Sequence, residues 1–264
     1  MTDTVGWELD GAVAVITLNR PAAHNSLTEE MKLGLLDAVR RAGASPEVRA
    51  VLITGAGRAF CAGQDLREHA AVLDARAQGH RTADTVREHY NPLVMAITSV
   101  PKPVVAAVNG VAAGAGASLA FACDLRIAAL GASFLMAFAR VGLAADSGAS
   151  WTLPRLIGMG RAAELLMLAE PVPAPRALEL GLVNSIVDDG DLPAVARALA
   201  ARLAAGPTGA YAGIKEQLRF AAAHDLEASL EKEAQIQAAL GHTEDHRSAT
   251  VAFTRKEQPT FRGR

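Results

Sequence analysis

The sequence is poor in cysteine and in aromatic residues (4%), and it has no excess of charge of either sign. Its two cysteines, Cys61 and Cys123, cannot supply a disulfide framework. Lysine and arginine total 26 against 28 aspartates and glutamates, a formal net charge of −2, whereas a general nucleic-acid-binding protein would be basic. No uninterrupted apolar run of about 18 residues is present, and residues 1–10 lack the basic and apolar regions of a signal peptide. We therefore expect a soluble, cytoplasmic globular protein that binds neither nucleic acid nor membrane.

Several familiar catalytic patterns are also missing. The seven histidines form no metal-binding spacing; His242 and His246 are four residues apart but lack a third ligand, so we interpret the histidines as surface residues. Ser118 and Ser147 lack the G-x-S-x-G context of a nucleophile elbow, and no P-loop is present. The sequence therefore predicts no metal site and no separate cofactor.

Hydrophobic residues make up 50% of the 264 positions, which is enough for one large domain, or for one domain with an appendage. In the first 130 residues, apolar strand patterns alternate with helical patterns about every 50 residues. This predicts parallel strands with helical crossovers, hence an α/β fold. The expected strands are 12–18, 50–54, 104–108 and 125–129. One helix is expected to begin at the capping-box pattern of residues 26–29, and two more to span 67–98 and 114–123.

After residue 150 the pattern becomes mostly helical. The last strong helix has one apolar face, which is more typical of a packing surface than of an active site. The basic end, residues 254–264, contains Pro259 and is expected to extend as a tail. The expected helices are 151–168, 175–181, 193–205, 209–223 and 225–240, with a short strand within 181–187.

Two glycine-rich loops and one aspartate are the candidates for chemistry. Residues 55–66 and 109–118 each follow a strand, and exposed N–H groups in such loops can bind an anion or a developing oxyanion. Each also has a plain structural interpretation, a strand-to-helix turn for the first and close helix packing for the second. Asp146 fits a helix N-cap, but the apolar residues before it also suit a carboxylate whose pKa is raised by desolvation.

Both loops together resemble the enoyl-CoA hydratase/isomerase (crotonase) superfamily. The resemblance covers essentially the whole chain in order, and several motifs stand at the correct separations. The motifs are NRP at 19–21, NSL at 25–27, AFCAGQDL at 59–66, VNGVAAGAG at 108–116, ACD at 122–124, GLV at 181–183 and Phe253-x-x-Lys256 with Pro259-x-Phe261.

This resemblance implies a spiral of ββα turns over residues 1–200, with a C-terminal helical trimerisation region over 201–264. It implies an acyl-CoA thioester substrate, and a homotrimer or a dimer of trimers. By motif position, the backbone N–H groups of Gln64 and Ala115 hold the thioester oxygen. Residues implied to line the coenzyme A path are Ala23, His24, Phe60, Ala62, Asp65 and Leu66, with Phe253 and Lys256 reaching in from a neighbouring subunit.

The acidic residues set the chemistry within this family, and here the sequence departs from the hydratase pattern. Ser118 and Phe138 occupy the positions at which hydratases carry glutamates, so Asp146 is left as the pocket carboxylate. Its context resembles the ring-epoxide phenylacetyl-CoA isomerases and Δ3,Δ2-enoyl-CoA isomerases, in which an aspartate here shuttles a proton, with Phe138 and Leu143 expected to keep the pocket dry. A weak hydratase, a dehalogenase with Asp146 as nucleophile, and a non-catalytic acyl-CoA or RNA binder remain alternatives.

Overall fold

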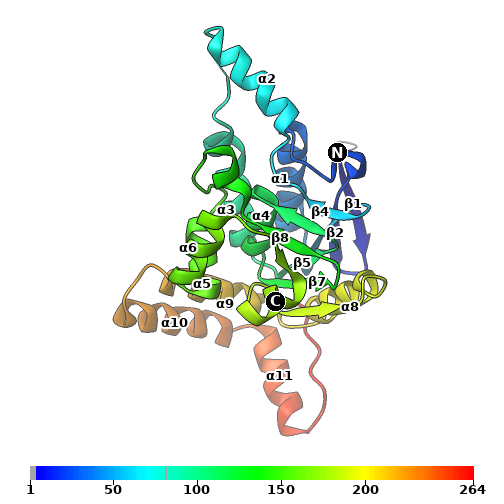
Figure 1. Cartoon of the computed structure of the whole chain (residues 1–264). Helices are drawn as coiled ribbons and strands as arrows, with labels where there is room; N and C mark the ends of the chain where they lie inside the picture. Colours follow the sequence, from blue (N-terminus) through cyan, green and yellow to red (C-terminus); the bar gives the residue numbers. More distant parts are fainter. Residues whose placement is uncertain (1–3, 81) are drawn as a thin grey trace.

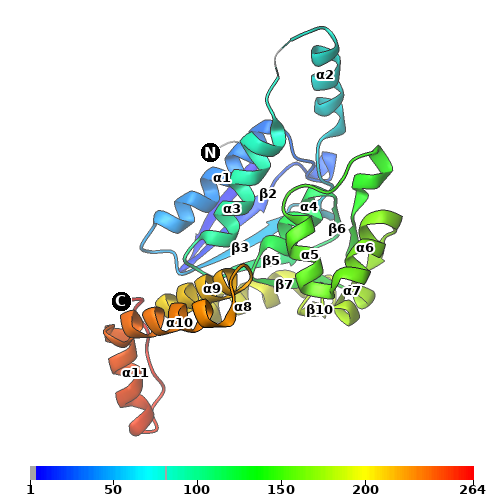
Figure 2. The same ribbon diagram turned by 90° about the vertical axis from the view of Figure 1, so that its left-hand side faces the viewer.

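The structure, a computed structural model, describes residues 4–80 and 82–264. Its centre is a six-stranded sheet with the order β1-β2-β3-β5-β7-β10 (Figures 1 and 2). Strands β2 (Val13–Leu18), β3 (Ala50–Gly55), β5 (Val104–Val108), β7 (Leu125–Ala129) and β10 (Ser185–Val187) all pair in parallel, as the alternating pattern predicts. Every residue of β5 is buried, because helices cover the sheet.

The first strand, β1 (Val5–Asp10), is absent from the sequence-based prediction. It pairs antiparallel with β2 through a tight turn at Gly11, whose φ of 57° suits glycine. Residues 8–10 of this strand are exposed, so its sequence lacks the sustained apolar pattern by which the other strands were predicted.

A second sheet of very short strands lies beside the first, in the order β4-β6-β8-β9. The strands are β4 (Ala59–Cys61), β6 (Val111–Ala113), β8 (Ser133–Leu135) and β9 (Val172–Pro173). Each of the central strands β3, β5 and β7 runs into one of these short strands and then into a helix, which produces the ββα turns that the resemblance implies. Residues 55–66, interpreted from the sequence as a loop, therefore include the short strand β4.

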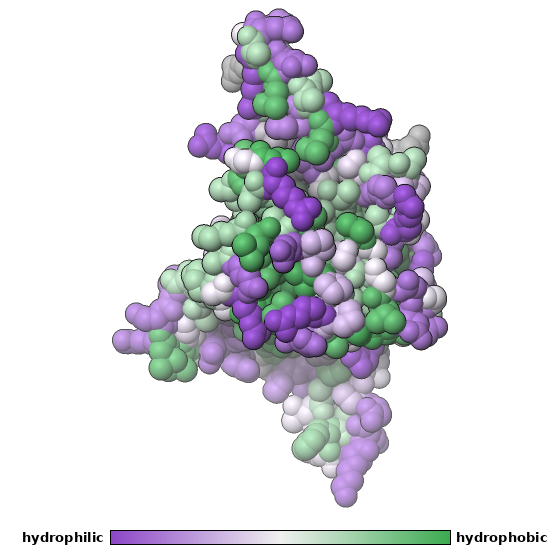
Figure 3. Space-filling view, in the orientation of Figure 1, coloured by the Kyte–Doolittle hydropathy of each residue, from purple (hydrophilic) through white to green (hydrophobic). Residues whose placement is uncertain are grey.

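The helices of the first half position the loops of interest. Helix α1 (Glu29–Ala44) begins at Thr28, whose hydroxyl accepts from Met31 N–H, and α4 (Ala115–Ala122) is buried along its whole length. The predicted helix over 67–98 is instead α2 (Leu66–Ala77), a connection, a π-helical turn (Val86–Tyr90) and α3 (Asn91–Ser99). Helix α2 has no buried residue and projects from the body (Figures 1 and 2), and Figure 3 shows hydrophobic and hydrophilic atoms side by side on this arm.

The second half is helical, with two differences from the prediction. The expected helix at 151–168 is split at Gly158, whose φ of 80° and ψ of 158° are not helical. A final helix, α11, follows Thr243, a capping residue whose signal the sequence analysis missed. The helices are α5 (Ala149–Ile157), α6 (Met159–Leu168), α7 (Ala174–Leu180), α8 (Leu192–Ala204), α9 (Thr208–Ala221), α10 (Leu226–Gly241) and α11 (Glu244–Thr254).

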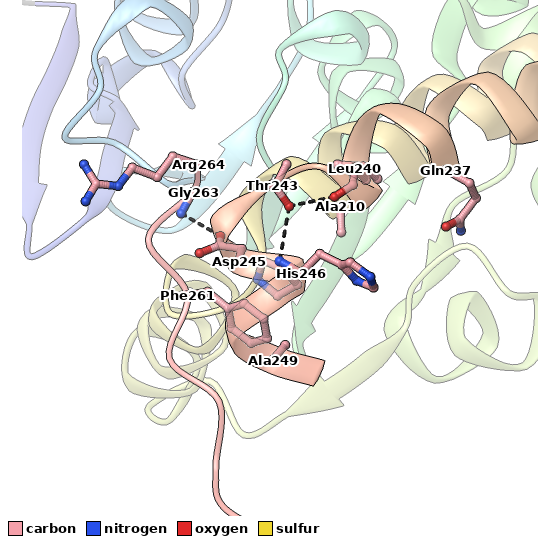
Figure 4. A pocket seen from close by; sticks show the side chains of 12 residues that line it. Ala210, Gln237, Leu240, Thr243, Asp245, His246, Ala249, Phe261, Gly263 and Arg264 are labelled. Carbon is pink, nitrogen blue, oxygen red and sulfur yellow. Dashed lines mark hydrogen bonds between the residues drawn. The ribbon is translucent and has the colours of Figure 1, made fainter. Parts of the chain in front are cut away.

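Helices α10 and α11 extend away from the sheets, at the end opposite α2 (Figure 2). The segment after α11 has no helix or strand, but it is not a free tail. The Asp245 carboxylate accepts the N–H groups of Arg262 (2.6 Å) and Gly263 (2.7 Å), which folds the segment back beside a small pocket (Figure 4). The division of the chain at residue 200 stays a prediction. In the part of the chain that the structure describes, no helix is long and apolar enough to cross a membrane.

Candidate active site

The loop that follows β4 is held in place by the segment that precedes α1. Ala62 N–H donates to His24 O (3.0 Å), Leu27 N–H donates to Gly63 O (2.7 Å), and Asp65 N–H donates to Leu27 O (3.1 Å). Gln64 lies between these contacts. Among residues 4–80 and 82–264, its backbone N–H has no protein acceptor.

Asn25 supports the strand that leads into the same loop through hydrogen bonds to its backbone. Its amide is fully buried; Nδ2 lies 2.7 Å from Ala59 O and 3.2 Å from Phe60 O, and Oδ1 accepts Arg20 N–H at 2.8 Å. In the sequence, Asn25 is recognisable only as part of the NSL motif at 25–27. The structure gives it a distinct role, fixing the strand that ends in the Gln64 loop.

The second glycine loop meets the first. Gly114 has a φ of 50° and precedes Ala115, the first residue of α4, whose N–H belongs to the unpaired first turn of a helix. A Cβ on Gly63 would lie 2.6 Å from Ala113 O and 3.5 Å from Ala115 N. The two loops are therefore in direct contact, and the N–H groups of Gln64 and Ala115 are in neighbouring positions at that contact. Close packing is also present, since Gly116 abuts Cys61.

Asp146 lies just before α5 and is half-buried. Burial raises the pKa of its carboxyl group, while a hydrogen bond from Ser147 Oγ (2.8 Å) and the positive charge of Lys32 act in the opposite direction. The N-cap interpretation is wrong: the capping position is Gly148, without a side-chain bond. Ser147 (φ 52°) and Gly148 (φ 76°) form a left-handed turn that separates Asp146 from the helix.

The two positions at which hydratases carry glutamates hold no acid here. Ser118 is fully buried and donates to Gly114 O (3.1 Å), and Phe138 is also buried. Leu143, expected to keep the pocket dry, is instead 53% exposed, so that expectation is wrong for Leu143. Another carboxylate near the site is Glu68 of α2, but it accepts Glu29 N–H at the start of α1 (2.9 Å).

A buried polar cluster, which sequence analysis missed, lies beside Gln64. Lys32 of α1 is 2% exposed, and its Nζ donates to Thr85 Oγ1 (2.6 Å) and Gln64 Oε1 (3.3 Å). Tyr90 donates its hydroxyl to the same Gln64 oxygen (2.6 Å). His89, also buried, contacts Thr85 at 3.1 Å, so the interpretation of all histidines as surface residues is wrong. In the sequence, this cluster is indicated only by a lysine, Lys32, on the apolar face of the amphipathic helix α1.

Most of the residues that the resemblance assigns to coenzyme A lie together. Phe60 is buried, Ala23 and Ala62 are half-buried, and His24 and Leu66 are exposed, all around the Gln64 loop. His24 Nε2 accepts Arg58 Nε–H (3.1 Å). Phe253 and Lys256 lie apart, at the end of α11 and just after it, and Phe253 is 85% exposed.

Asp65 has a structural function in this loop. Its carboxylate caps α2 through Arg67 and Glu68 N–H, and it pairs with Arg20 at 2.9 Å. Burial opposes its charge, but hydrogen bonds from Arg20, Glu68 N–H and Ser26 outweigh that effect and lower the pKa to about 2. Asp65 is therefore an anion that fixes the loop, and its side chain is already fully engaged.

Comparison with known proteins agrees with this geometry. The profile of the enoyl-CoA hydratase/isomerase family matches residues 8–264. A probable enoyl-CoA hydratase from Rhodobacter capsulatus is 44% identical (99% of this chain, 98% of that protein), and 1,2-epoxyphenylacetyl-CoA isomerase from Escherichia coli K12 is 40% identical over the full length of both. The crystal structure of an enoyl-CoA hydratase from Polaromonas sp. JS666 superposes with a TM-score of 0.89 at 35% identity, covering 97% of this chain and 99% of that one. The chain belongs to the enoyl-CoA hydratase/isomerase family and has the crotonase fold.

Proposed function

We propose that this protein is an acyl-CoA isomerase that moves a carbon–carbon double bond, from Δ3 to Δ2 or within a ring-derived acyl group. Asp146 shuttles the proton. The observation that carries this proposal is Asp146, a half-buried carboxylate whose charge interacts with that of Lys32 beside the Gln64 loop, while Ser118 and Phe138 occupy the positions where hydratases have acids.

The reaction needs one base and an anion-binding site. The thioester oxygen accepts from the N–H groups of Gln64 and Ala115. The Asp146 carboxylate takes a proton from C2, and the electrons of that C–H bond move into a dienolate whose charge rests on the thioester oxygen. Asp146 then gives the proton to C4, which leaves the double bond between C2 and C3. Losing one such backbone donor typically raises the barrier by about 2.7–4 kcal/mol.

The pKa of Asp146 suits this task because burial raises it from the ordinary value. A base with a raised pKa binds its proton more strongly, and a carboxylic acid so formed can still return it. The buried Phe138 restricts water at the site, and restricted water strengthens the hydrogen bonds to the enolate oxygen.

Substrate binding is proposed on the same basis. Ala23, His24, Phe60, Ala62, Asp65 and Leu66 surround the entry of coenzyme A, and Phe253 and Lys256 serve the site of a neighbouring subunit. Their distance from the Gln64 loop within one chain, and the exposure of Phe253, support a homotrimer or a dimer of trimers.

Hydration is the second candidate, because a relative with 44% identity is named as a probable enoyl-CoA hydratase. In that case Asp146 would activate water for addition to a Δ2-enoyl-CoA. Proton delivery would need a further group, and no acid stands at Ser118 or Phe138.

The test offers Δ3-enoyl-CoA and Δ2-enoyl-CoA separately and follows the products by mass-resolved chromatography. We expect double-bond migration without mass change; a product heavier by one water would identify the hydratase. Asp146→Asn should abolish migration while coenzyme A binding is retained, and Asp37→Asn, an exposed carboxylate of α1, serves as the matched control. Normal turnover by Asp146→Asn would remove the carboxylate from the mechanism.

A further inference from the structure

Lys32 is a buried cation that the proposed reaction does not use. Its side chain extends from α1 to the side chain of Gln64, and its Nζ lies 5.0 Å from the centre of the Tyr90 ring. Among the described residues, no carboxylate oxygen is within ion-pair distance of it. Burying an ammonium group without a direct counter-ion is costly, so its retention calls for a function.

The first consequence of this position concerns Gln64. Two donors, the Lys32 ammonium and the Tyr90 hydroxyl, converge on the single oxygen Oε1 of its side chain, at 3.3 and 2.6 Å. The backbone N–H of the same residue is the proposed donor to the thioester oxygen. A side chain fixed at its end leaves the loop fewer ways to turn that N–H away.

The second consequence concerns Asp146. Burial lowers the pKa of the Lys32 ammonium, while the negative charges of Glu68, Glu29 and Asp146 raise it, so these three carboxylates lie within electrostatic range of Lys32. Glu68 already accepts Glu29 N–H, and Glu29 lies 3.9 Å from His89 Nε2. Asp146 has only the Ser147 hydroxyl as a hydrogen-bond partner among the described side chains. The other titratable groups that face this cluster are Tyr90 and Cys61, both neutral in ordinary buffers because burial raises the pKa of each.

We propose that Lys32 is a positioning residue of the active site, which fixes the Gln64 loop through Oε1 and supplies the positive charge that faces the Asp146 carboxylate. The proposal rests on the proposed function, in which Asp146 must be ionised to accept a proton. A nearby cation favours the ionised carboxylate and so lowers its pKa. Removal of the cation raises that pKa, and activity is then lost at a higher pH as the solution is acidified.

The test compares Lys32→Met, which keeps the length of the side chain, with Lys32→Arg, which keeps its charge. Lys102→Met is the matched control, because Lys102 is also buried, and its Nζ donates to the carbonyls of Ala42 and Ser45 at the far end of α1. The pH dependence of kcat is measured for each variant. For Lys32→Met we expect kcat to fall about tenfold or more, and the acidic limb to move up by about one pH unit, the lower end of the effect of one opposite charge.

Lys32→Arg should restore most of that shift, and Lys102→Met should keep the acidic limb of the wild type even if it lowers stability. An unmoved acidic limb in Lys32→Met would overturn the proposal. A second measurement is independent of turnover: 13C NMR of aspartate-labelled protein follows the Asp146 carboxyl, with Asp146→Asn assigning its signal. If no double bond migrates in the wild type, the isomerase proposal fails, whereas an equal Asp146 pKa in wild type and Lys32→Met would refute the role of Lys32 alone.

Discussion

Gly63 offers the sharpest test of the contact between the two glycine loops. Its φ is 88°, so a Gly63→Ala substitution places a side chain in left-handed backbone, at a cost of about 1–2 kcal/mol. The new Cβ would also stand 2.6 Å from Ala113 O and 3.5 Å from Ala115 N. Both neighbours are backbone atoms, so the loops themselves must separate.

Gly79→Ala provides the matched control, because Gly79 has a similar φ of 82° but nothing within 4 Å of its Cβ position. Both variants carry the left-handed strain, and only Gly63→Ala displaces the proposed oxygen-binding amides. If separation removes one donor, kcat for double-bond migration should fall by about 10²–10³.

The assay is the kcat for migration, together with the free energy of unfolding in urea for both variants. We expect Gly79→Ala to keep the wild-type kcat. The kcat of Gly63→Ala should be at least a hundredfold lower than that of Gly79→Ala, because one backbone donor to the thioester oxygen is lost. Equal kcat values for the two alanine variants would refute the idea that these loops hold the thioester oxygen.

Three further predictions concern the support of the site. The ionised Asp65 carboxylate contributes to stability fully above the ordinary carboxyl pKa, and this contribution is lost as the pH falls toward about 2. In Asp65→Asn, the free energy of unfolding in urea should therefore depend less on pH between those two values. Asn25→Ala removes a hydrogen-bond partner from Arg20 N–H and from the carbonyl oxygens of Ala56 and Phe60, and should lower the free energy of unfolding by about 1–3 kcal/mol or more, measured by urea denaturation. The Phe253 side chain is 85% exposed in one chain. Phe253→Ala should therefore raise KM for acyl-CoA, while the free energy of unfolding of the dissociated chain changes by no more than about 0.5 kcal/mol.

The long elements of the fold could be predicted because their apolar patterns are sustained. Strand β5 is buried throughout, and α1 repeats Met31, Leu35 and Val39 on one side. The strands of the second sheet have only two or three residues, too few for any period to be visible in the sequence. Strand β1 was missed for a different reason, since its outer half is exposed.

The candidate site could be predicted only in part. The Gln64 loop and the start of α4 are contiguous in sequence and carry a recognisable glycine pattern, so their positions follow from motifs. The N-cap prediction for Asp146 failed because Ser147 and Gly148 both adopt left-handed backbone, which residue preferences do not reveal. Lys32, Gln64 and Tyr90 come from three separate segments, and their contact arises only from the packing of α1 against the Gln64 loop and the turn before α3.

The positions of the carboxylates bear on the choice between the proposed isomerisation and the addition of water. A hydratase needs a group to activate water and a group to deliver the proton, and Glu68 and Glu29 are the other carboxylates near Lys32. Glu68 is bound to Glu29 N–H at 2.9 Å, at the positive end of the α1 dipole, where a negative charge is stabilised. Burial raises the pKa of the Asp146 carboxyl group, and the positive charge of the buried Lys32 ammonium acts in the opposite direction. In the proposed mechanism the Asp146 carboxylate takes a proton and returns it, whereas the Glu68 carboxylate is engaged by a backbone N–H at the start of α1.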